Sequence, residues 1–205
     1  EIVNTDIYPN VIKTYGDIVG KTSAQFLEGF RRDVWDNYKN TPFWLSFDWT
    51  VNQLPTTNKS ILAWRGNTKD GNVKNDVYVW PLRLWEDGTV KMSVQNSAGA
   101  YVNFATPFKV SVGNTYRIDV RFDLAHSTFD VFADGVYLDT GYHSRLSSTN
   151  KEVGAYPMIR FIDGGAGKHD FTNIVITRGV TPENHKHNTS LNDEFDNGVL
   201  VDKTT

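Results

Sequence analysis

The sequence predicts an all-β protein, an antiparallel two-sheet jelly-roll sandwich, and three observations support this fold. Short segments alternate apolar and polar residues with a period of two, which is typical of strands with one buried face. Turn residues separate these segments at the spacing expected of a sandwich. The 205 residues are 39% hydrophobic and 13% aromatic, enough apolar surface for one large core.

The expected strands follow one another along the chain. The first, at 23–27, leads into an irregular excursion, although Phe26, Phe30, Val34 and Tyr38 lie near helical spacing and keep a helix open as an alternative. In "FWLSFDWTV" (43–51) the apolar residues take one face and the polar residues the other. Further strands are expected at 60–64, 77–85, 89–95, 101–105, 116–123, 128–133, 158–162 and 171–177.

Tight turns connect the clearest pairs of strands. "EDG" separates 77–85 from 89–95, and "LAHS" separates 116–123 from 128–133. A further turn is expected at Asp134-Gly135. The sandwich is predicted to span 1–179, followed by a polar C-terminal arm or linker at 180–205 whose "GVLV" would pair with a sheet edge.

Composition excludes several classes of function. The net charge is −3 without a block of lysine or arginine, so we expect no nucleic-acid partner. No apolar run approaches the roughly 18 residues that a membrane span needs. The absence of cysteine excludes disulfides, thiolate metal ligands and thiol catalysis, and argues against a small eukaryotic secreted module. The start at Glu1 suggests a processed chain or an excised domain, for which we expect an extracellular or particle-surface location, bacterial or phage.

Several segments occur in the order found in one known family. They are "GKTSAQF" followed by "NTPFWLSFDWTV", then "VWPLRLWEDGTVKMSV", "VGNTYRIDVRFDLAHSTFDVFADGVYLDTG" and "HDFTNIVITRG". Over 19–179 the chain resembles laminin-G-like domains of the concanavalin A-like lectin and glucanase superfamily. The resemblance implies the sandwich fold, but that superfamily includes lectins, carbohydrate-binding modules, hydrolases, lyases and adhesins, so it fixes no function. It also implies a structural calcium ion at Asp170, which begins the last strand, with Asp17 as a weaker second ligand.

Two enzyme patterns of that superfamily are missing. Laminarinase-type glucanases carry Glu-x-Asp-x-Glu on one strand, because retaining hydrolysis needs two carboxyl groups about 5 Å apart. The nearest match, Glu194-Phe195-Asp196, has no second glutamate and lies in the tail. The Gln-x-His strand of alginate-lyase-like jelly rolls has its nearest counterpart in Gln95-Asn96-Ser97, which lacks the histidine.

Charged residues at outward positions suggest an anion-binding face. Arg117, Asp119 and Arg121 alternate with apolar residues in "YRIDVRFD", and Arg83, Lys91 and Arg160 have the same outward parity on other strands. If these residues share one sheet, the outer face of that sheet is basic. Its arginines would then suit the carboxylate or sulfate groups of a ligand. The alternative is cross-strand pairing of Arg and Asp on a solvated face, worth about 0.2–1 kcal/mol per pair.

Two tryptophans add a sugar-binding element to this set. Trp44 and Trp85 have outward parity, beside Asp48 and Arg83 respectively. An exposed indole stacks well on the C–H face of a sugar, and a neighbouring carboxylate binds hydroxyl groups. The alternative is that both rings pack under a loop.

Three hypotheses of function follow. The first is a noncatalytic extracellular domain that binds a polysaccharide or glycan, including an acidic one. The second is a structural or adhesive subunit of a filament, surface layer or phage particle, forming a homo-oligomer through the C-terminal arm. The third is a polysaccharide lyase acting on a uronic-acid glycan. In the lyase, Arg117 or Arg121 would neutralise the carboxylate and His169, Tyr101 or Tyr142 would move the proton.

Overall fold

The computed structural model describes residues 11–23, 25–28, 42–66, 77–93, 101–123, 128–142, 158–162 and 165–178. Within these residues it contains thirteen strands and no helix, and therefore no helix long and apolar enough to cross a membrane. All strand pairs are antiparallel, which confirms the predicted sandwich. The strands are β1 (Val11–Thr14), β2 (Ile18–Lys21), β3 (Gln25–Glu28), β4 (Phe43–Gln53), β5 (Lys59–Gly66), β6 (Val77–Leu84), β7 (Thr89–Ser93), β8 (Tyr101–Lys109), β9 (Thr115–Asp123), β10 (Thr128–Ala133), β11 (Val136–Tyr142), β12 (Met158–Phe161) and β13 (Lys168–Arg178).

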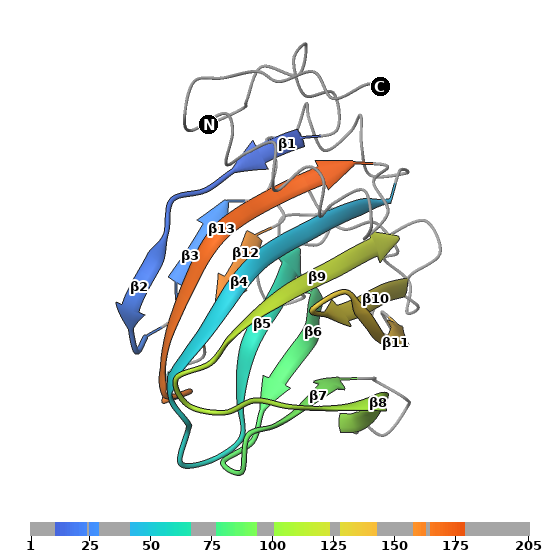
Figure 1. The fold of residues 1–205 in the computed structure, drawn as a ribbon. Coiled ribbons are helices and arrows are strands. Elements are labelled where there is room, and N and C mark those ends of the chain that lie inside the picture. Colours follow the sequence, from blue (N-terminus) through green and yellow to red (C-terminus); the bar gives the residue numbers. More distant parts are fainter. Residues whose placement is uncertain are drawn as a thin grey trace, which may run out of the picture.

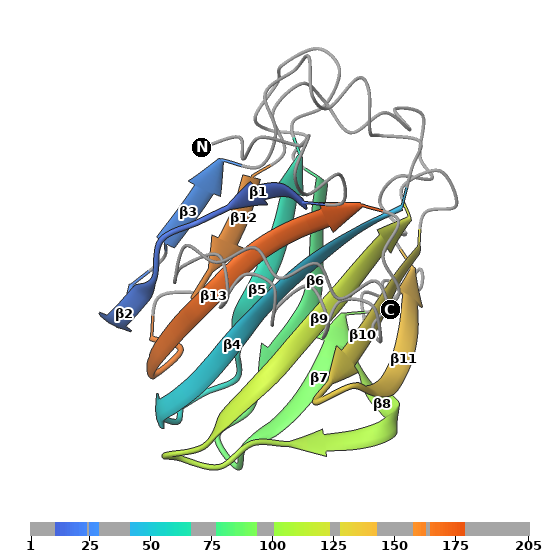
Figure 2. The ribbon, with the colours of Figure 1, turned by 45° about the horizontal axis from the view of Figure 1, so that its top comes forward.

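The strands form two stacked sheets. Sheet A has the order β1-β13-β4-β9-β10-β11, and β2 also pairs with β13. Sheet B has the order β3-β12-β5-β6-β7-β8. In Figure 1 the strands of sheet A cross in front of those of sheet B, and Figure 2 shows the same two layers with the top of the molecule tilted forward. Each sheet therefore has one face toward the core and one outer face.

The core lies between the sheets and is built by the alternation of the strands. On β4 the side chains of Phe43, Leu45, Phe47, Trp49 and Val51 are all buried, because every second residue points inward. On β9, Ile118, Val120 and Phe122 do the same.

Three phenylalanines join the two sheets through the core. Phe161 of sheet B lies 5.0 Å from Phe47 and 4.5 Å from Phe171, measured between ring centroids. All three rings are fully buried, and each contributes about 1.5–3 kcal/mol to the free energy of unfolding. This cluster fixes which face of each sheet is outer.

Two hairpin turns follow their sequence signals. Asp134 and Gly135 both have positive φ, as a type I′ turn requires, and Asp134 Oδ1 accepts a hydrogen bond from the Arg117 amide at 2.8 Å. In "EDG", Asp87 accepts hydrogen bonds from the amide and hydroxyl of Thr89, and these bonds lower the pKa of Asp87. Both turns fix the register of the strands that they connect.

The ten predicted strands are present, and three more exist. One of these, β11, follows the turn that was expected at Asp134-Gly135. β1 and β2 were not predicted because each has four residues without a clear alternation; both pair with β13. β13 begins at Lys168 rather than at 171, because its first residues pair with β4. The excursion at 29–41 and the arm at 180–205 lie outside the described residues, so the domain boundary stays a prediction.

Candidate functional site

The predicted ligand-binding residues lie on two opposite faces of the sandwich. Those on the outer face of sheet A are Trp44, Asp48, Arg117, Asp119 and Arg121. Those of sheet B are Arg83, Lys91 and Arg160, with Trp85 directly after β6. No single ligand would contact both sets. The basic face was predicted on the condition that these residues share one sheet, and they do not.

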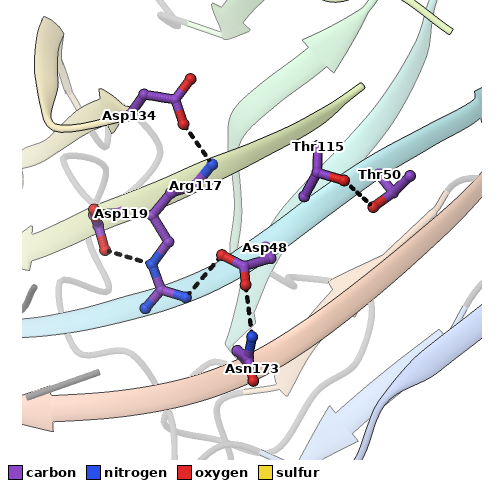
Figure 3. Close-up of polar contacts among 7 residues, drawn as sticks. All are labelled: Asp48, Thr50, Thr115, Arg117, Asp119, Asp134 and Asn173. Carbon is purple, nitrogen blue, oxygen red and sulfur yellow. Dashed lines mark hydrogen bonds and ion pairs between the residues drawn. The ribbon is translucent and has the colours of Figure 1, made fainter. Parts of the chain in front are cut away.

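On sheet A, Arg117 is the centre of a polar network (Figure 3). Its Nη1 lies 3.1 Å from Asp48 Oδ1, and its Nε lies 3.6 Å from Asp119 Oδ1. Asp48 comes from β4, so the first of these contacts joins neighbouring strands. The other oxygen of Asp48 accepts a hydrogen bond from Asn173 Nδ2 at 2.6 Å. Asn173 has a φ of 51° at an irregularity of β13, a conformation that asparagine adopts more readily than most residues.

Arg121 makes a second set of pairs on the same face. It contacts Asp130 Oδ2 at 3.1 Å and Asp123 Oδ2 at 3.6 Å. Asp130 also accepts a hydrogen bond from Thr140 Oγ1 on β11. We call Arg117, Arg121 and their four aspartates the Arg–Asp ladder. It contains two positive and four negative groups, so the ladder as a whole is acidic.

The centre of this face is also closed to solvent. Ser46 is 0% exposed, Asp119 1% and Trp44 4%, although all three point away from the core. Trp44 has the predicted outward parity, but its ring packs on Phe132 at 5.4 Å rather than lying open. Two contacts of the Arg–Asp ladder, Arg117–Asp48 and Arg121–Asp130, are thus cross-strand pairs, and its other two lie within β9.

Sheet B presents a different chemistry. Ser60, Arg83, Lys91 and Asn103 face one another in register across β5, β6, β7 and β8, and we call them the cationic row. Arg83 and Lys91 are directly opposite, a placement of like charges that costs stability. The Arg83 guanidinium donates to Asn58 Oδ1 at 2.8 and 2.9 Å.

The second cation of the row lies against an aromatic ring. Lys91 Nζ lies 4.7 Å from the centre of the Trp85 ring, within the range of a cation–π contact. Both side chains are half-buried. Arg160 is on β12, outside this row, and its side chain is also half-buried.

His169 lies in the core rather than on a surface. It is fully buried, its Nδ1 accepts a hydrogen bond from Trp49 Nε1 at 3.2 Å, and its Nε2 donates to the carbonyl of Ala166 at 2.8 Å. These bonds assign the neutral tautomer with the proton on Nε2. This position gives His169 no access to a polysaccharide, so it cannot serve the predicted lyase chemistry. The side chains of Tyr101 and Tyr142 lie outside the described residues.

Burial makes His169 a source of acid sensitivity. Desolvation lowers its pKa below the ordinary 6.5, although the Ala166 carbonyl and Asp170 act in the opposite direction. Below pH 6.5 the unfolded chain binds a proton that the fold excludes, so this contribution to stability is present above 6.5 and lost as the pH falls toward the folded-state pKa.

We expect the free energy of unfolding, measured by urea denaturation, to fall as the pH drops below the ordinary histidine pKa of 6.5. In His169→Gln the amide would accept from Trp49 and donate to Ala166 without titrating, so its pH slope should be shallower. Equal slopes in the two proteins would show that His169 does not control the acid response.

Asp170 has a structural role that the calcium prediction did not include. Its Oδ1 accepts a hydrogen bond from the Gly20 amide at 2.6 Å, which ties β2 to β13. Asp17 is exposed in the connection between β1 and β2. Among the described residues no three acidic, histidine or cysteine side chains form a group that could hold a metal ion. Calcium takes six to eight oxygens, and many of them are backbone carbonyls, so the calcium site at Asp170 and Asp17 stays a prediction.

The sequence reasoning did not single out Tyr137, which is an exposed aromatic residue on the outer face of sheet A. It lies opposite Phe132 on β10, and its hydroxyl lies 2.7 Å from Thr140 Oγ1. The outward position of Tyr137 could have been predicted from "DGVYLDT", because the turn at Asp134-Gly135 sets the register of β11 against β10. What the parity did not indicate is that this ring, unlike Trp44, stays open.

Comparisons with known proteins show a shared fold. No family model and no curated protein matches the sequence. Among solved structures, the chain is similar to Trypanosoma rangeli sialidase, with a TM-score of 0.54 and 15% identity over 85% of this chain. It is also similar to the receptor-binding domain of botulinum neurotoxin C/D mosaic serotype, with a TM-score of 0.55 and 10% identity over 86% of this chain. The chain spans 26% of the sialidase and 43% of the toxin domain.

Proposed function

We propose that this chain is a noncatalytic glycan-binding domain of the laminin-G-like type, and that it binds an acidic glycan through the cationic row and Trp85. The observation that carries the proposal is the register of Arg83 and Lys91, which lie directly opposite each other on neighbouring strands. Like charges in this position destabilise a sheet, whereas an anionic ligand between them gains two charge-assisted hydrogen bonds.

Each part of the row has a task in this proposal. Arg83 is held by Asn58, which orients its guanidinium before a ligand arrives. Lys91 lies over Trp85, so the cation and the ring form one surface for a sugar carrying a carboxylate or sulfate group. Such prior orientation lowers the entropy cost of binding.

The opposite face suits this ligand less well. There the Arg–Asp ladder is acidic as a whole and its centre is buried. The fold likeness to a sialidase and to a toxin receptor-binding domain is consistent with a role in glycan binding. An extracellular or particle-surface location is part of the same proposal.

The test is affinity electrophoresis of the whole chain in gels containing alginate, polygalacturonate or chondroitin sulfate. We expect at least one of these to retard the wild type, and retardation to weaken with added salt. Arg83→Ala with Lys91→Ala should weaken binding about tenfold or more, because each lost charge-assisted hydrogen bond costs about 1.5–3 kcal/mol.

The matched control changes the same charge elsewhere. Lys21→Ala with Lys168→Ala removes two exposed lysines of sheet A and should leave retardation unchanged. Equal losses in both double variants would mean that binding depends only on net charge. A wild type that none of the three polysaccharides retards would contradict the proposal.

A further inference from the structure

A second surface of the molecule has the features of a sugar platform. Tyr137 is 47% exposed, and among the aromatic residues whose side chains the structure describes it alone reaches this degree of exposure. Its neighbour Val136 is exposed as well. Both belong to β11, the edge strand of sheet A beside β10, where the chain leaves the turn at Asp134-Gly135.

The Tyr137 ring is held in place from two directions. It packs edge-on against Phe132 with centroids 5.4 Å apart, and Phe132 in turn packs on the buried Trp44 at 5.4 Å. At the other end of the ring, the hydroxyl lies 2.7 Å from Thr140 Oγ1. A rigid exposed ring loses little conformational entropy when a ligand stacks on it.

The hydrogen-bond directions follow from the single proton of Thr140. Thr140 Oγ1 donates that proton to Asp130 Oδ1 at 2.5 Å, so in the contact with Tyr137 it must accept. Tyr137 therefore donates, and its oxygen keeps lone pairs that accept hydrogen bonds from a ligand. The second Asp130 oxygen is bound to Arg121 Nη1 at 3.1 Å.

The ring is thus bordered by a chain of hydrogen-bonded groups, Tyr137–Thr140–Asp130–Arg121, and the two charged groups of this chain are accessible to a ligand from solvent. The side chains of Asp130 and Arg121 are 20% and 32% exposed. A carboxylate that accepts and a guanidinium that donates, side by side, match two neighbouring hydroxyl groups of a sugar. Asp123, which also contacts Arg121, adds a second carboxylate on this side of the sheet, which disfavours a negatively charged ligand.

We infer that this surface, which we call the Tyr137 platform, binds a neutral pyranose: the sugar's C–H face stacks on Tyr137 and its hydroxyl groups bind Asp130 and Arg121. The platform lies on sheet A and the cationic row on sheet B, so the two sites are on opposite faces and take ligands of different charge. The inference does not depend on acidic-glycan binding by the row.

The test uses the whole chain and neutral probes: affinity electrophoresis in dextran, mannan, galactan and xylan, and saturation-transfer NMR with the methyl glycosides of glucose, mannose, galactose and xylose. We expect retardation by at least one neutral polysaccharide and saturation transfer to its glycoside. Tyr137→Ala should weaken binding about tenfold or more, as for an aromatic anchor at the centre of a site. Tyr137→Phe keeps the ring and should retain most of the binding.

Two controls separate this site from other causes. Val112→Ala truncates another exposed apolar residue in a different turn and should leave binding unchanged. Arg83→Ala with Lys91→Ala should also leave neutral-sugar binding unchanged, whatever it does to acidic glycans. The inference is overturned if no neutral probe binds, if Tyr137→Ala binds like the wild type, or if the row variant abolishes neutral binding. Thermal melts of Tyr137→Ala and Tyr137→Phe check that both variants are folded.

Discussion

Gly167→Ala is expected to lower the free energy of unfolding by about 4 kcal/mol, a large share of the roughly 5–15 kcal/mol typical of a domain. Gly167 precedes β13 with a φ of +102°, and a Cβ built there would lie 2.1 Å from the Gln53 carbonyl oxygen. The backbone strain costs about 1–3 kcal/mol and the overpacking about as much again. Because the clash is with backbone atoms at the end of β4, no side chain can rotate away to relieve it.

Two other glycines separate these causes. Gly113 has a φ of +86° but open space around its Cβ position, so Gly113→Ala should show only the backbone cost, about 1–2 kcal/mol. Gly16 has open space and no positive φ, so Gly16→Ala should change stability by less than about 1 kcal/mol. Urea denaturation of the three variants checks this order. A Gly167→Ala protein as stable as Gly113→Ala would show that the packing at Gln53 yields.

Arg117→Ala is the second substitution with a large expected effect, about 2–4 kcal/mol. Arg117 contacts Asp48 and Asp119, and Asp119 is almost completely buried. Removing the cation leaves a buried carboxylate without this neighbour, which costs far more than losing an exposed ion pair. Chemical denaturation measures the loss. Adding Asp119→Asn to Arg117→Ala should recover part of it, because the buried negative charge is then removed.

Arg121→Ala is the matched control on the same strand. Arg121 also contacts two aspartates, but its side chain is 32% exposed, compared with 15% for Arg117. Solvent screens the more exposed guanidinium of Arg121 better, but the side chain of Asp123 is only 10% exposed, so we expect a loss of about 1–2 kcal/mol, smaller than for Arg117→Ala. Equal losses for the two arginines would mean that burial does not determine how strongly the Arg–Asp ladder stabilises the fold.

Much of the fold could be predicted because alternation is a local property. In "YRIDVRFD" the inward set Ile118, Val120 and Phe122 and the outward set of charges follow from the period of two, and the structure confirms both. The turn at Asp134-Gly135 could be predicted for the same reason, since its chemistry lies in two adjacent residues.

The candidate site could not be predicted in the same way because it depends on which strands become neighbours. Outward parity is shared by Arg83 and Arg117, but the first lies on sheet B and the second on sheet A. Parity also does not decide whether an outer face is open: Trp44 is buried and Tyr137 is not. Both properties depend on contacts between residues that are far apart in the chain.

The position of β13 has a consequence for how the molecule folds. This strand is the last of the described strands, yet it pairs with β1, β2 and β4, so three early strands of sheet A meet a partner that is synthesised late. Pairing strands that are so far apart in the chain slows folding, and domains dominated by such pairings fold in about milliseconds to seconds, which is slow for a single domain. In a nascent chain, β1, β2 and the edge of β4 that pairs with β13 therefore have no strand partner until residue 178 has left the ribosome. During that interval the unpaired strand edges depend on chaperones, or on rapid completion of the chain, to avoid aggregation.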